Sequence, residues 1–351
     1  MPEAMIDARQ ALTESLRRLV IRSPTSFSFG DDPPVDVRTL PPVASWGPGM
    51  QYSSVVPRAD PLVSAIQALL YDRCYAQRSS PPASLSTPGQ SVDPAFARAL
   101  VAANGGRERW EKGWTIHQFG PNGQVFVRKG DRERAAVPGS FIFDGVPGWT
   151  PQIGAMVSLR VPHESFDAQP GYYFAFGDVL DELADQMTLV RLYFHCSAES
   201  APRLIGELTG SLNRFQTPFQ LKAPAAPGFY GRTDAAVLYV AARHFSVVAR
   251  IVALVRHEIA LEPTTPLFTK RLWPGIGAAV EPGSGESFGT HRCRLTAEGV
   301  VSAWRADGGQ DIERRLTAVA ARFAVDGFDL DRPWLGPSGV DPFDIAALAI
   351  R

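Results

Sequence analysis

Leu189-Val-Arg-Leu-Tyr-Phe-His195 is an apolar run with two basic side chains, and it sets the kind of fold that we expect. Its composition predicts a β-strand, on which Arg191, Tyr193 and His195 share a face because strand side chains alternate with a period of two residues. Removing a charge from water costs several kcal/mol unless the charge is paired. An apolar strand that carries basic side chains therefore predicts a partner for them.

Three later runs repeat this combination of an apolar, strand-like sequence with Lys or Arg. They are Phe219-Gln-Leu-Lys222, Gly231-Arg232 before 235–240, and Phe268-Thr-Lys-Arg271. Acidic residues are scarce beside these positions, so we expect the missing partner to be an anionic ligand. Phosphate is the leading candidate.

Outward from these runs, the sequence predicts an α+β fold in which a mainly antiparallel sheet is flanked by helices. Asn122-Gly123, between two alternating runs, predicts a hairpin over 114–128. Strands are also expected at 140–143, 155–161, 172–176, 189–195, 218–222 and 235–240. Helices are expected at 4–21, 61–75, 94–104, 198–212, 242–258, 297–305 and 312–323, with Asp93 as the N-cap of the third.

Stretches rich in Pro, Gly and Ser interrupt the N-terminal part of the chain, up to Pro57 and again at 79–90, and we expect them to be loops. A boundary near Gly139 is expected to separate a helix-and-hairpin region, residues 1–139, from a larger α+β domain, residues 140–351. The first region is a candidate for peptide or partner recognition by strand addition.

Composition narrows the classes of function. The 351 residues carry 35 Lys plus Arg against 36 Asp plus Glu, a formal charge of -1, which lacks the basic excess of proteins that bind nucleic acids or anionic membranes. The three cysteines, Cys74, Cys196 and Cys293, have no metal-ligand spacing and are odd in number, so neither a zinc site nor a disulfide framework is expected. Without a signal-peptide or membrane-span pattern, we expect a cytoplasmic protein.

Each candidate functional residue also has a structural explanation. His195 is either an acid in a pocket or a satisfied, partly buried histidine. Lys222 is either a base or a solvated lysine at a strand end. Arg232 either binds a ligand or pairs with Asp234.

The glycine-rich segment 273–289 precedes three further basic side chains, His291, Arg292 and Arg294. Backbone amides and Arg guanidinium groups together suit phosphate. The alternatives are a mobile surface loop and a nucleotide-binding loop, although no Lys-Ser/Thr follows the last glycine. Hydrolase elbows and zinc motifs do not occur in the sequence.

Two segments give the chain a family resemblance: Leu100-Val-Ala-Ala-Asn-Gly-Gly-Arg-Glu-Arg-Trp110 and Gly171-Tyr-Tyr-Phe-Ala-Phe-Gly-Asp178. They resemble the HopA-type type III effector family. Relatives of that family act as lyases in class V lanthipeptide and thioamitide biosynthesis. The family is in turn similar to bacterial phosphothreonine lyases, which use a lysine base, a histidine acid and several arginines to eliminate phosphate.

The resemblance implies roles for particular residues and makes residues 140–351 a lyase-like domain. Lys222 would be the base and His195 the acid. The phosphate-binding set would be Arg232, Lys270, Arg271, His291, Arg292 and Arg294, with support from Arg191, Tyr193 and Tyr239. Phosphothreonine lyases carry a second lysine where this chain has Tyr193, and Arg191 or Lys270 would have to replace it.

The implied reaction turns a phosphoserine or phosphothreonine of a precursor peptide into dehydroalanine or dehydrobutyrine, and it needs no metal and no cofactor. A separate kinase would supply the phosphopeptide, because the chain has no kinase motifs. The competing class is a non-catalytic, effector-like protein that binds a phosphopeptide or a partner with the same cations.

Overall fold

The computed structural model describes residues 8–40, 60–78, 92–145, 152–179, 188–283, 285–308, 310–343 and 345. The loop expected after the first helix and up to Pro57 was wrong for its described part, which includes the strands Ser26–Phe29 and Val35–Asp36. Residues 41–57 and the loop expected at 79–90 lie outside the described ranges. Within them, none of the helices combines the length and the apolar character that a bilayer span needs.

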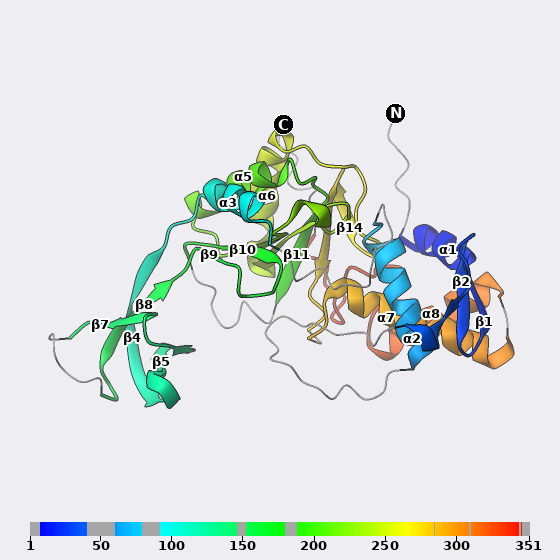
Figure 1. The fold of residues 1–351 in the computed structure, drawn as a ribbon, viewed down its shortest axis with the longest axis horizontal. Helices are drawn as coiled ribbons and strands as arrows, with labels where there is room; N and C mark the ends of the chain where they lie inside the picture. Colours follow the sequence, from blue (N-terminus) through cyan, green and yellow to red (C-terminus); the bar gives the residue numbers. More distant parts are fainter. Residues whose placement is uncertain are drawn as a thin grey trace.

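A seven-stranded antiparallel sheet forms the centre of the molecule, in the order β14-β15-β11-β13-β12-β10-β9 (Figure 1). Its strands are β9 Glu164–Ser165, β10 Tyr172–Phe176, β11 Leu189–Phe194, β12 Gln220–Pro224, β13 Ala236–Ala241, β14 Lys270–Trp273 and β15 Ile276–Val280. The predicted strands at 172–176, 189–195, 218–222 and 235–240 all belong to this sheet, and the α+β prediction is confirmed.

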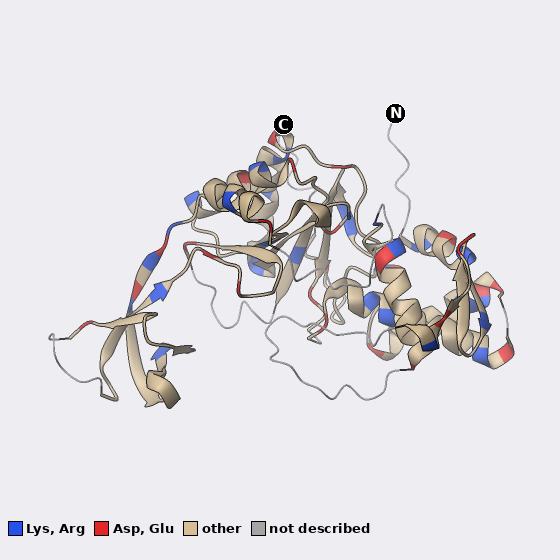
Figure 2. Ribbon diagram, in the orientation of Figure 1, with Lys and Arg blue, Asp and Glu red and all other residues tan. Residues whose placement is uncertain are grey.

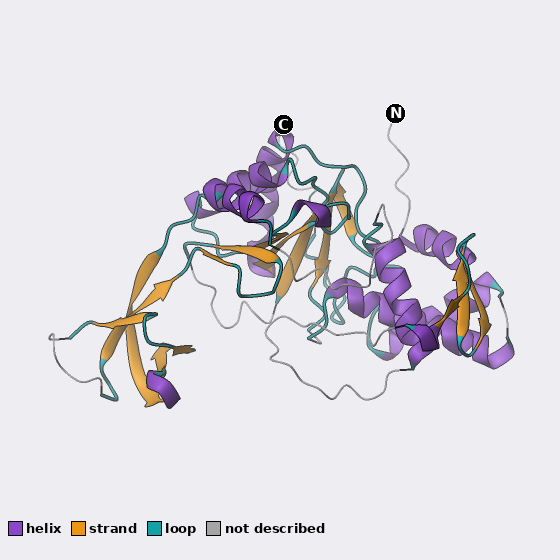
Figure 3. Ribbon diagram, in the orientation of Figure 1, coloured by secondary structure: helices purple, strands orange, loops and turns teal. Residues whose placement is uncertain are grey.

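Helices cover both faces of the central sheet (Figure 3). The first face packs into one core with α3 Pro94–Ala103, α5 Ala201–Arg214 and α6 Phe245–Val255. The second face packs into another core with α1 Ala8–Arg18, α2 Pro61–Leu70, α7 Phe288–Asp307 and α8 Ile312–Val325. Strand alternation assigns each side chain of a strand to one of these cores.

The N-terminal elements belong to the second core. The predicted helix at 4–21 is shorter than expected, because residues after Arg18 enter a three-stranded sheet of β1 Leu19–Ser23, β2 Ser26–Phe29 and β3 Val35–Asp36. Helix α2 continues into a π-helix, Tyr71–Tyr75. Such π-helical turns are rare in proteins, and those that occur are often found at functional sites.

A second, five-stranded sheet lies at the left of Figure 1, in the order β6-β5-β4-β8-β7. Its strands are β4 Arg109–Phe119, β5 Val125–Lys129, β6 Arg132–Ala136, β7 Phe141–Phe143 and β8 Met156–Val161. The predicted hairpin is confirmed as β4 and β5, and Asn122 takes a positive φ of 56° in the turn. The expected division near Gly139 falls between β6 and β7, inside this sheet.

The segment 273–289, which the sequence presented as a loop, contains β15 and the start of α7. Its glycines mark close packing: a Cβ on Gly277 would lie 2.4 Å from Thr269 Oγ1, and one on Gly289 would lie 2.3 Å from the Tyr75 ring. The loop interpretation was therefore wrong for these residues. His291, Arg292 and Arg294 lie within α7, which begins at Phe288 rather than near 297.

Candidate functional site

Basic and tyrosine side chains gather on the second face of the central sheet. Lys222 of β12 pairs with Val237 of β13, which in turn pairs with Tyr193 of β11. Arg191 and Tyr239 form the neighbouring cross-strand pair. Because paired residues point to the same side of a sheet, these residues share one face. The order of the strands therefore brings together four side chains from three strands, β11, β12 and β13.

Lys222 lies among aromatic rings rather than acids. Its Nζ is 3.9 Å from the centre of the Tyr172 ring and 6.0 Å from that of Phe174. Within the described ranges, no hydrogen bond or ion pair to Lys222 is formed. Burial, reinforced by the positive charges of Arg232 and Arg191 and opposed by Asp234, lowers the pKa of Lys222 to about 7.

Arg232 is buried and pairs with Asp234, as its structural explanation required. Its Nη2 donates to Asp234 Oδ2 at 2.7 Å and to the Tyr71 hydroxyl at 2.9 Å, and that hydroxyl donates to the same carboxylate at 3.0 Å. Although burial alone would raise the pKa of Asp234, the Arg232 guanidinium holds it below its ordinary value. The pair leaves Nη1 of Arg232 without a hydrogen bond to the described residues.

Arg191 is also buried and paired. Its Nε donates to Glu281, and its guanidinium lies 5.0 Å from the centre of the Tyr239 ring. Neither of its two Nη nitrogens bonds to another group in the described part of the chain. The expectation that acids are scarce beside the basic positions was therefore wrong for Arg191 and Arg232. Figure 2 shows acidic segments interleaved with basic ones across the fold.

The π-helix Tyr71–Tyr75 packs against the second face of the central sheet and the 231–234 loop. Thr233 donates from its backbone N to Ala76 O at 2.8 Å and from Oγ1 to Tyr75 O at 2.7 Å, which fastens the 231–234 loop to this helix. Tyr75 meets Tyr193 edge-on, with ring centres 6.2 Å apart. The absence of a side chain at Gly289 lets α7 pack against the Tyr75 ring.

His195 lies one residue beyond the end of β11, where its backbone N still donates to Gly275 O at 2.9 Å. Alternation along the strand gives it the same face as Tyr193. Its Nδ1 is 3.0 Å from Thr264 Oγ1, and burial lowers its pKa. With strands about 4.8 Å apart and a rise of about 3.4 Å per residue, its backbone is roughly 12 Å from that of Lys222.

The basic side chains of α7 have other partners. Arg292 is fully buried and donates from Nε to Pro333 O at 2.8 Å and from Nη2 to Leu335 O at 2.9 Å, while its guanidinium lies 3.9 Å from the centre of the Phe328 ring. His291 Nδ1 is 2.8 Å from Arg292 Nη1. Burial and the Arg292 charge lower the pKa of His291 to about 3, so its neutral ring accepts this hydrogen bond.

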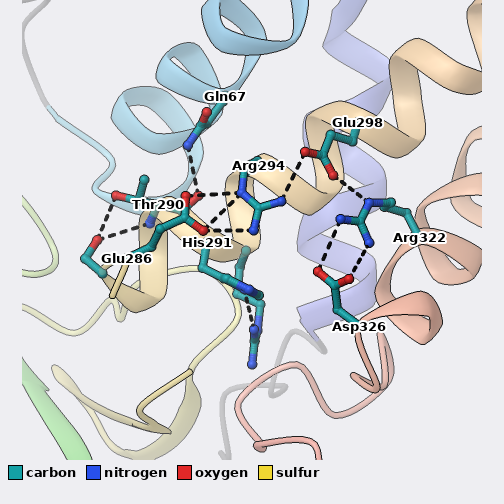
Figure 4. A network of polar contacts seen from close by, with 10 residues as sticks. Gln67, Glu286, Thr290, His291, Arg294, Glu298, Arg322 and Asp326 are labelled. Atoms are coloured by element: carbon teal, nitrogen blue, oxygen red, sulfur yellow. Dashed lines mark hydrogen bonds and ion pairs between the residues drawn. The ribbon is translucent and has the colours of Figure 1, made fainter. Parts of the chain in front are cut away.

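Arg294 belongs to a chain of ion pairs that links α7 to α8 (Figure 4). Its Nη2 is 2.8 Å from Glu286 Oε2 and its Nη1 is 3.0 Å from Glu298 Oε1. Arg322 of α8 connects Glu298 to Asp326. The ion pairs of this network join α7 to α8, which is a structural role.

The two basic residues of β14 lie apart from Lys222. Lys270 pairs in the sheet with Ala278, which belongs to the first face, and its Nζ is 2.8 Å from Asp341 Oδ2. Arg271 is on the second face, but four strand spacings put its backbone roughly 19 Å from that of Lys222. Of the expected set, the structure brings together Lys222, Arg191, Arg232, Tyr193 and Tyr239, with His195 at the margin.

Three residues of this cluster were not singled out from the sequence: Tyr71, Tyr172 and Glu281. Tyr71 is 161 positions away from Arg232, so no local pattern relates them. Tyr172 follows from the antiparallel pairing of β10 with β12, in which it lies opposite Pro224. The register of the sheet reveals the position of Tyr172, whereas the contact of Tyr71 with Arg232 comes from the packing of the π-helix Tyr71–Tyr75.

The cluster combines a lysine of lowered pKa, several tyrosines and two guanidinium groups that each keep a donor without an acceptor among the described residues. Such a set suits proton abstraction beside an anion. In the described part of the chain, no group of three His, Cys, Asp or Glu side chains has the arrangement of a metal site. The three cysteines are buried and free.

Comparison with known proteins gives one family match. Residues 163–335 match the profile of the HopA1 effector protein family. The matched range includes 171–178, one of the two segments that carry the expected resemblance. A search of curated proteins finds no match.

Two solved effector structures are similar to this chain. The effector protein from Pseudomonas syringae pv. tomato strain DC3000 is 18% identical, with a TM-score of 0.40 over 77% of this chain and 89% of that one. The effector protein from Pseudomonas syringae pv. syringae strain 61 is 14% identical, with a TM-score of 0.39 over 78% of this chain and 94% of that one.

Proposed function

We propose that this protein is a phosphoserine/phosphothreonine lyase that eliminates phosphate from a phosphorylated precursor peptide, leaving dehydroalanine or dehydrobutyrine. The observation that carries the proposal is the environment of Lys222. It is a lysine with a pKa of about 7 and no acidic partner among the described residues, beside the guanidinium groups of Arg191 and Arg232.

The first step is proton abstraction. With a pKa of about 7, the Lys222 amine is uncharged in about half of the molecules at neutral pH, whereas an ordinary lysine is almost fully protonated. The neutral Nζ accepts the Cα proton of the phosphorylated residue. The electron pair of that C–H bond forms the Cα=Cβ double bond, the Cβ–O bond breaks, and its electrons leave with the phosphate.

The guanidinium donors that have no acceptor in the described part of the chain suit the departing anion. The two Nη nitrogens of Arg191 and Nη1 of Arg232 have capacity for hydrogen bonds to phosphate oxygens, and such charge-assisted bonds are about twice as strong as neutral ones. Their internal partners, Glu281 and Asp234, offset the cost of burying the two charges before substrate arrives. The clamp is thus held in place in the free protein.

His195 is the proposed acid. Burial lowers its pKa, so the imidazole of the free protein is largely neutral at pH 7. A bound phosphate dianion favours the imidazolium and so raises this pKa again. The proton then passes from His195 to the phosphate oxygen that leaves Cβ, and the product is a hydrogen phosphate ion.

The place of the reaction follows from its chemistry and from the sequence resemblance to HopA-type lyases. A separate kinase must supply the phosphate ester, since elimination consumes it. We therefore assign the protein to the dehydration step of lanthipeptide or thioamitide biosynthesis, acting on a ribosomal precursor peptide. No metal and no cofactor take part in this scheme.

Mass spectrometry tests the proposal directly. Purified protein is incubated with a peptide that carries one phosphoserine or phosphothreonine, and the expected product has lost the elements of phosphoric acid and reacts with an added thiol at the new double bond. The unphosphorylated peptide is the control. A phosphopeptide that binds but is recovered intact contradicts the lyase and supports the non-catalytic, effector-like alternative.

A further inference from the structure

A second group of arginines lies on the other side of the π-helix. Arg18, Arg73 and Arg78 line a hollow with a volume of about 400 Å³, which we call the arginine hollow. Arg18 ends α1, and Arg73 belongs to the π-helix Tyr71–Tyr75. Leu267, from the segment before β14, closes one side.

The charges in the arginine hollow do not balance. Arg73 Nη2 is 2.6 Å from Asp32 Oδ2, and Arg78 Nε is 3.3 Å from Asp72 Oδ1. Arg18 pairs with no carboxylate in the described ranges, and its guanidinium lies 4.4 Å from the centre of the Phe29 ring. Among the described residues, three guanidinium groups against two carboxylates leave one positive charge.

The walls suit a ligand with a short apolar stem. Phe29 and Leu267 are buried apolar residues on the lining, whereas Arg18, also on the lining, is exposed to solvent. One surplus positive charge matches a carboxylate better than a phosphate dianion. A glutamate or aspartate side chain has both the stem and the single charge.

The hollow is connected to the Lys222 site through short contacts. Gln77, on its lining, donates from Nε2 to Thr265 O at 3.4 Å, and the adjacent Thr264 contacts His195. The positive charge of Arg78 also contributes to the low pKa of Asp234. A helix is about 10–12 Å across, and an extended peptide covers about 3.3 Å per residue, so three to four residues span the two sites.

We propose that the arginine hollow binds an acidic side chain of the peptide substrate, three to four residues from the phosphorylated residue. This inference rests on the proposed function for its substrate class. It adds a specificity site, because a peptide with the acidic residue at the right spacing gains a charge-assisted contact to Arg18 that other peptides lack.

Binding of matched phosphopeptides to Lys222→Met protein, which does not consume them, tests the inference by calorimetry. Each pair of peptides differs only by Glu or Gln at one position, scanned over two to five residues on either side of the phosphoserine. We expect the Glu peptide to bind about tenfold tighter at three or four residues on one side. Equal affinities for Glu and Gln at every position contradict the inference.

Two variants locate the contact. Arg18→Gln is expected to remove the preference for Glu, whereas Arg22→Gln, an exposed arginine on the neighbouring β1 whose Nε contacts Ser28 Oγ at 3.2 Å, is expected to keep it. An equal loss in both variants would mean nonspecific attraction and overturn the assignment. A gain that is larger with a second phosphoserine than with Glu would overturn the choice of a carboxylate.

The two proposals can fail separately. If the Glu preference depends on Arg18 but wild-type protein leaves the phosphate in place, the lyase proposal fails and the arginine hollow remains a peptide-binding site. If wild-type protein eliminates phosphate at equal rates and affinities from Glu and Gln peptides, only the inference fails.

Discussion

Lys222 on β12, which is half-buried, and Arg292 on α7, which is fully buried, lie on the same side of the central sheet, but their surroundings differ in kind. All three guanidinium nitrogens of Arg292 have partners: two backbone carbonyls and the ring of His291. Lys222 has rings around it and no acceptor in the described part of the chain. A buried basic group whose donors all have acceptors stabilises the fold. A basic group without an acceptor is instead a candidate for proton transfer or ligand binding.

The difference also separates Arg191 and Arg232 from the arginines of α7. Each of the first two pairs with one acid and keeps at least one Nη nitrogen without a bond to the described residues. Arg294 is engaged by two glutamates. Variants at these positions therefore test whether the two groups of basic side chains have different roles.

The largest expected effect is on activity, in Lys222→Met. Removal of a general base costs about 10²- to 10⁴-fold in rate, so we expect elimination to fall by at least about 10²-fold while phosphopeptide binding is kept. Single-turnover mass spectrometry measures the rate, and calorimetry measures the binding.

Lys222→Arg is the matched control for this prediction. Arginine keeps the positive charge but is not deprotonated in proteins, so this variant is also expected to be inactive. If Lys222→Arg retains most of the wild-type rate, the positive charge rather than the neutral amine is what the reaction needs, and Lys222 is not the base.

The next effect is on stability, in Arg292→Met. The substitution keeps an unbranched side chain but leaves Pro333 O and Leu335 O without a donor in the interior. An unsatisfied buried acceptor costs about 1–3 kcal/mol, so we expect a loss of about 3–5 kcal/mol in the free energy of unfolding. Urea titration measures it. A loss below about 1 kcal/mol would show that Arg292 is not a structural residue.

Most of the central sheet could be predicted from the sequence, because β10, β11, β12 and β13 are apolar runs with clear boundaries. The strand β15 and the first turns of α7 could not. Their glycines indicate flexibility when only the neighbouring sequence is known, yet Gly277 and Gly289 are required by Thr269 and Tyr75 from elsewhere in the chain. Tertiary packing decided what local propensity could not.

The candidate site shows the same limit. Alternation along one strand was enough to place Arg191, Tyr193 and His195 on one face. The acids that pair with the arginines could be anticipated only where they are close in sequence, as Asp234 is to Arg232. Glu281 is 90 positions from Arg191, so the sequence made Arg191 look unpaired. The order of strands in the sheet is the information that was missing.

The third prediction concerns the pH dependence of stability. Between pH 7 and 10.5 the unfolded chain holds a proton on Lys222 that the folded chain has largely released, because burial lowers the folded pKa. Stability therefore rises with pH through this window and is lost as pH falls toward 7. Lys222→Met removes this contribution, so we expect its stability relative to the wild type to be greater at pH 6 than at pH 10, on the order of 2–4 kcal/mol.

Urea unfolding of both proteins at pH 6, 8 and 10 measures this difference. Lys270→Met is the control, because Lys270 pairs with Asp341 and lies on the other face of the sheet. Parallel pH curves for the wild type and Lys222→Met would show that the lysine pKa is ordinary and would remove the main support for the base.

A smaller effect is expected for Tyr71→Phe. The Tyr71 hydroxyl bridges Arg232 and Asp234, and hydrogen bonds to charged groups contribute about 1.5–3 kcal/mol. The direct bonds between Arg232 and Asp234 remain, so we expect a loss of about 1–2 kcal/mol in stability and about a tenfold lower affinity for phosphopeptide. If the free energy of unfolding falls while the affinity for phosphopeptide stays at the wild-type value, the guanidinium of Arg232 does not contact the ligand.

The smallest effect is expected for Arg294→Gln. Its ion pairs with Glu286 and Glu298 are partly exposed, and pairs of this kind contribute about 0–1 kcal/mol because water and salt screen them. We expect unfolding to be easier by less than about 1 kcal/mol, and elimination to proceed at the wild-type rate. A large loss of phosphopeptide affinity at unchanged stability would instead return Arg294 to the phosphate-binding set. It would also mean that a guanidinium held by two glutamates can still serve a ligand.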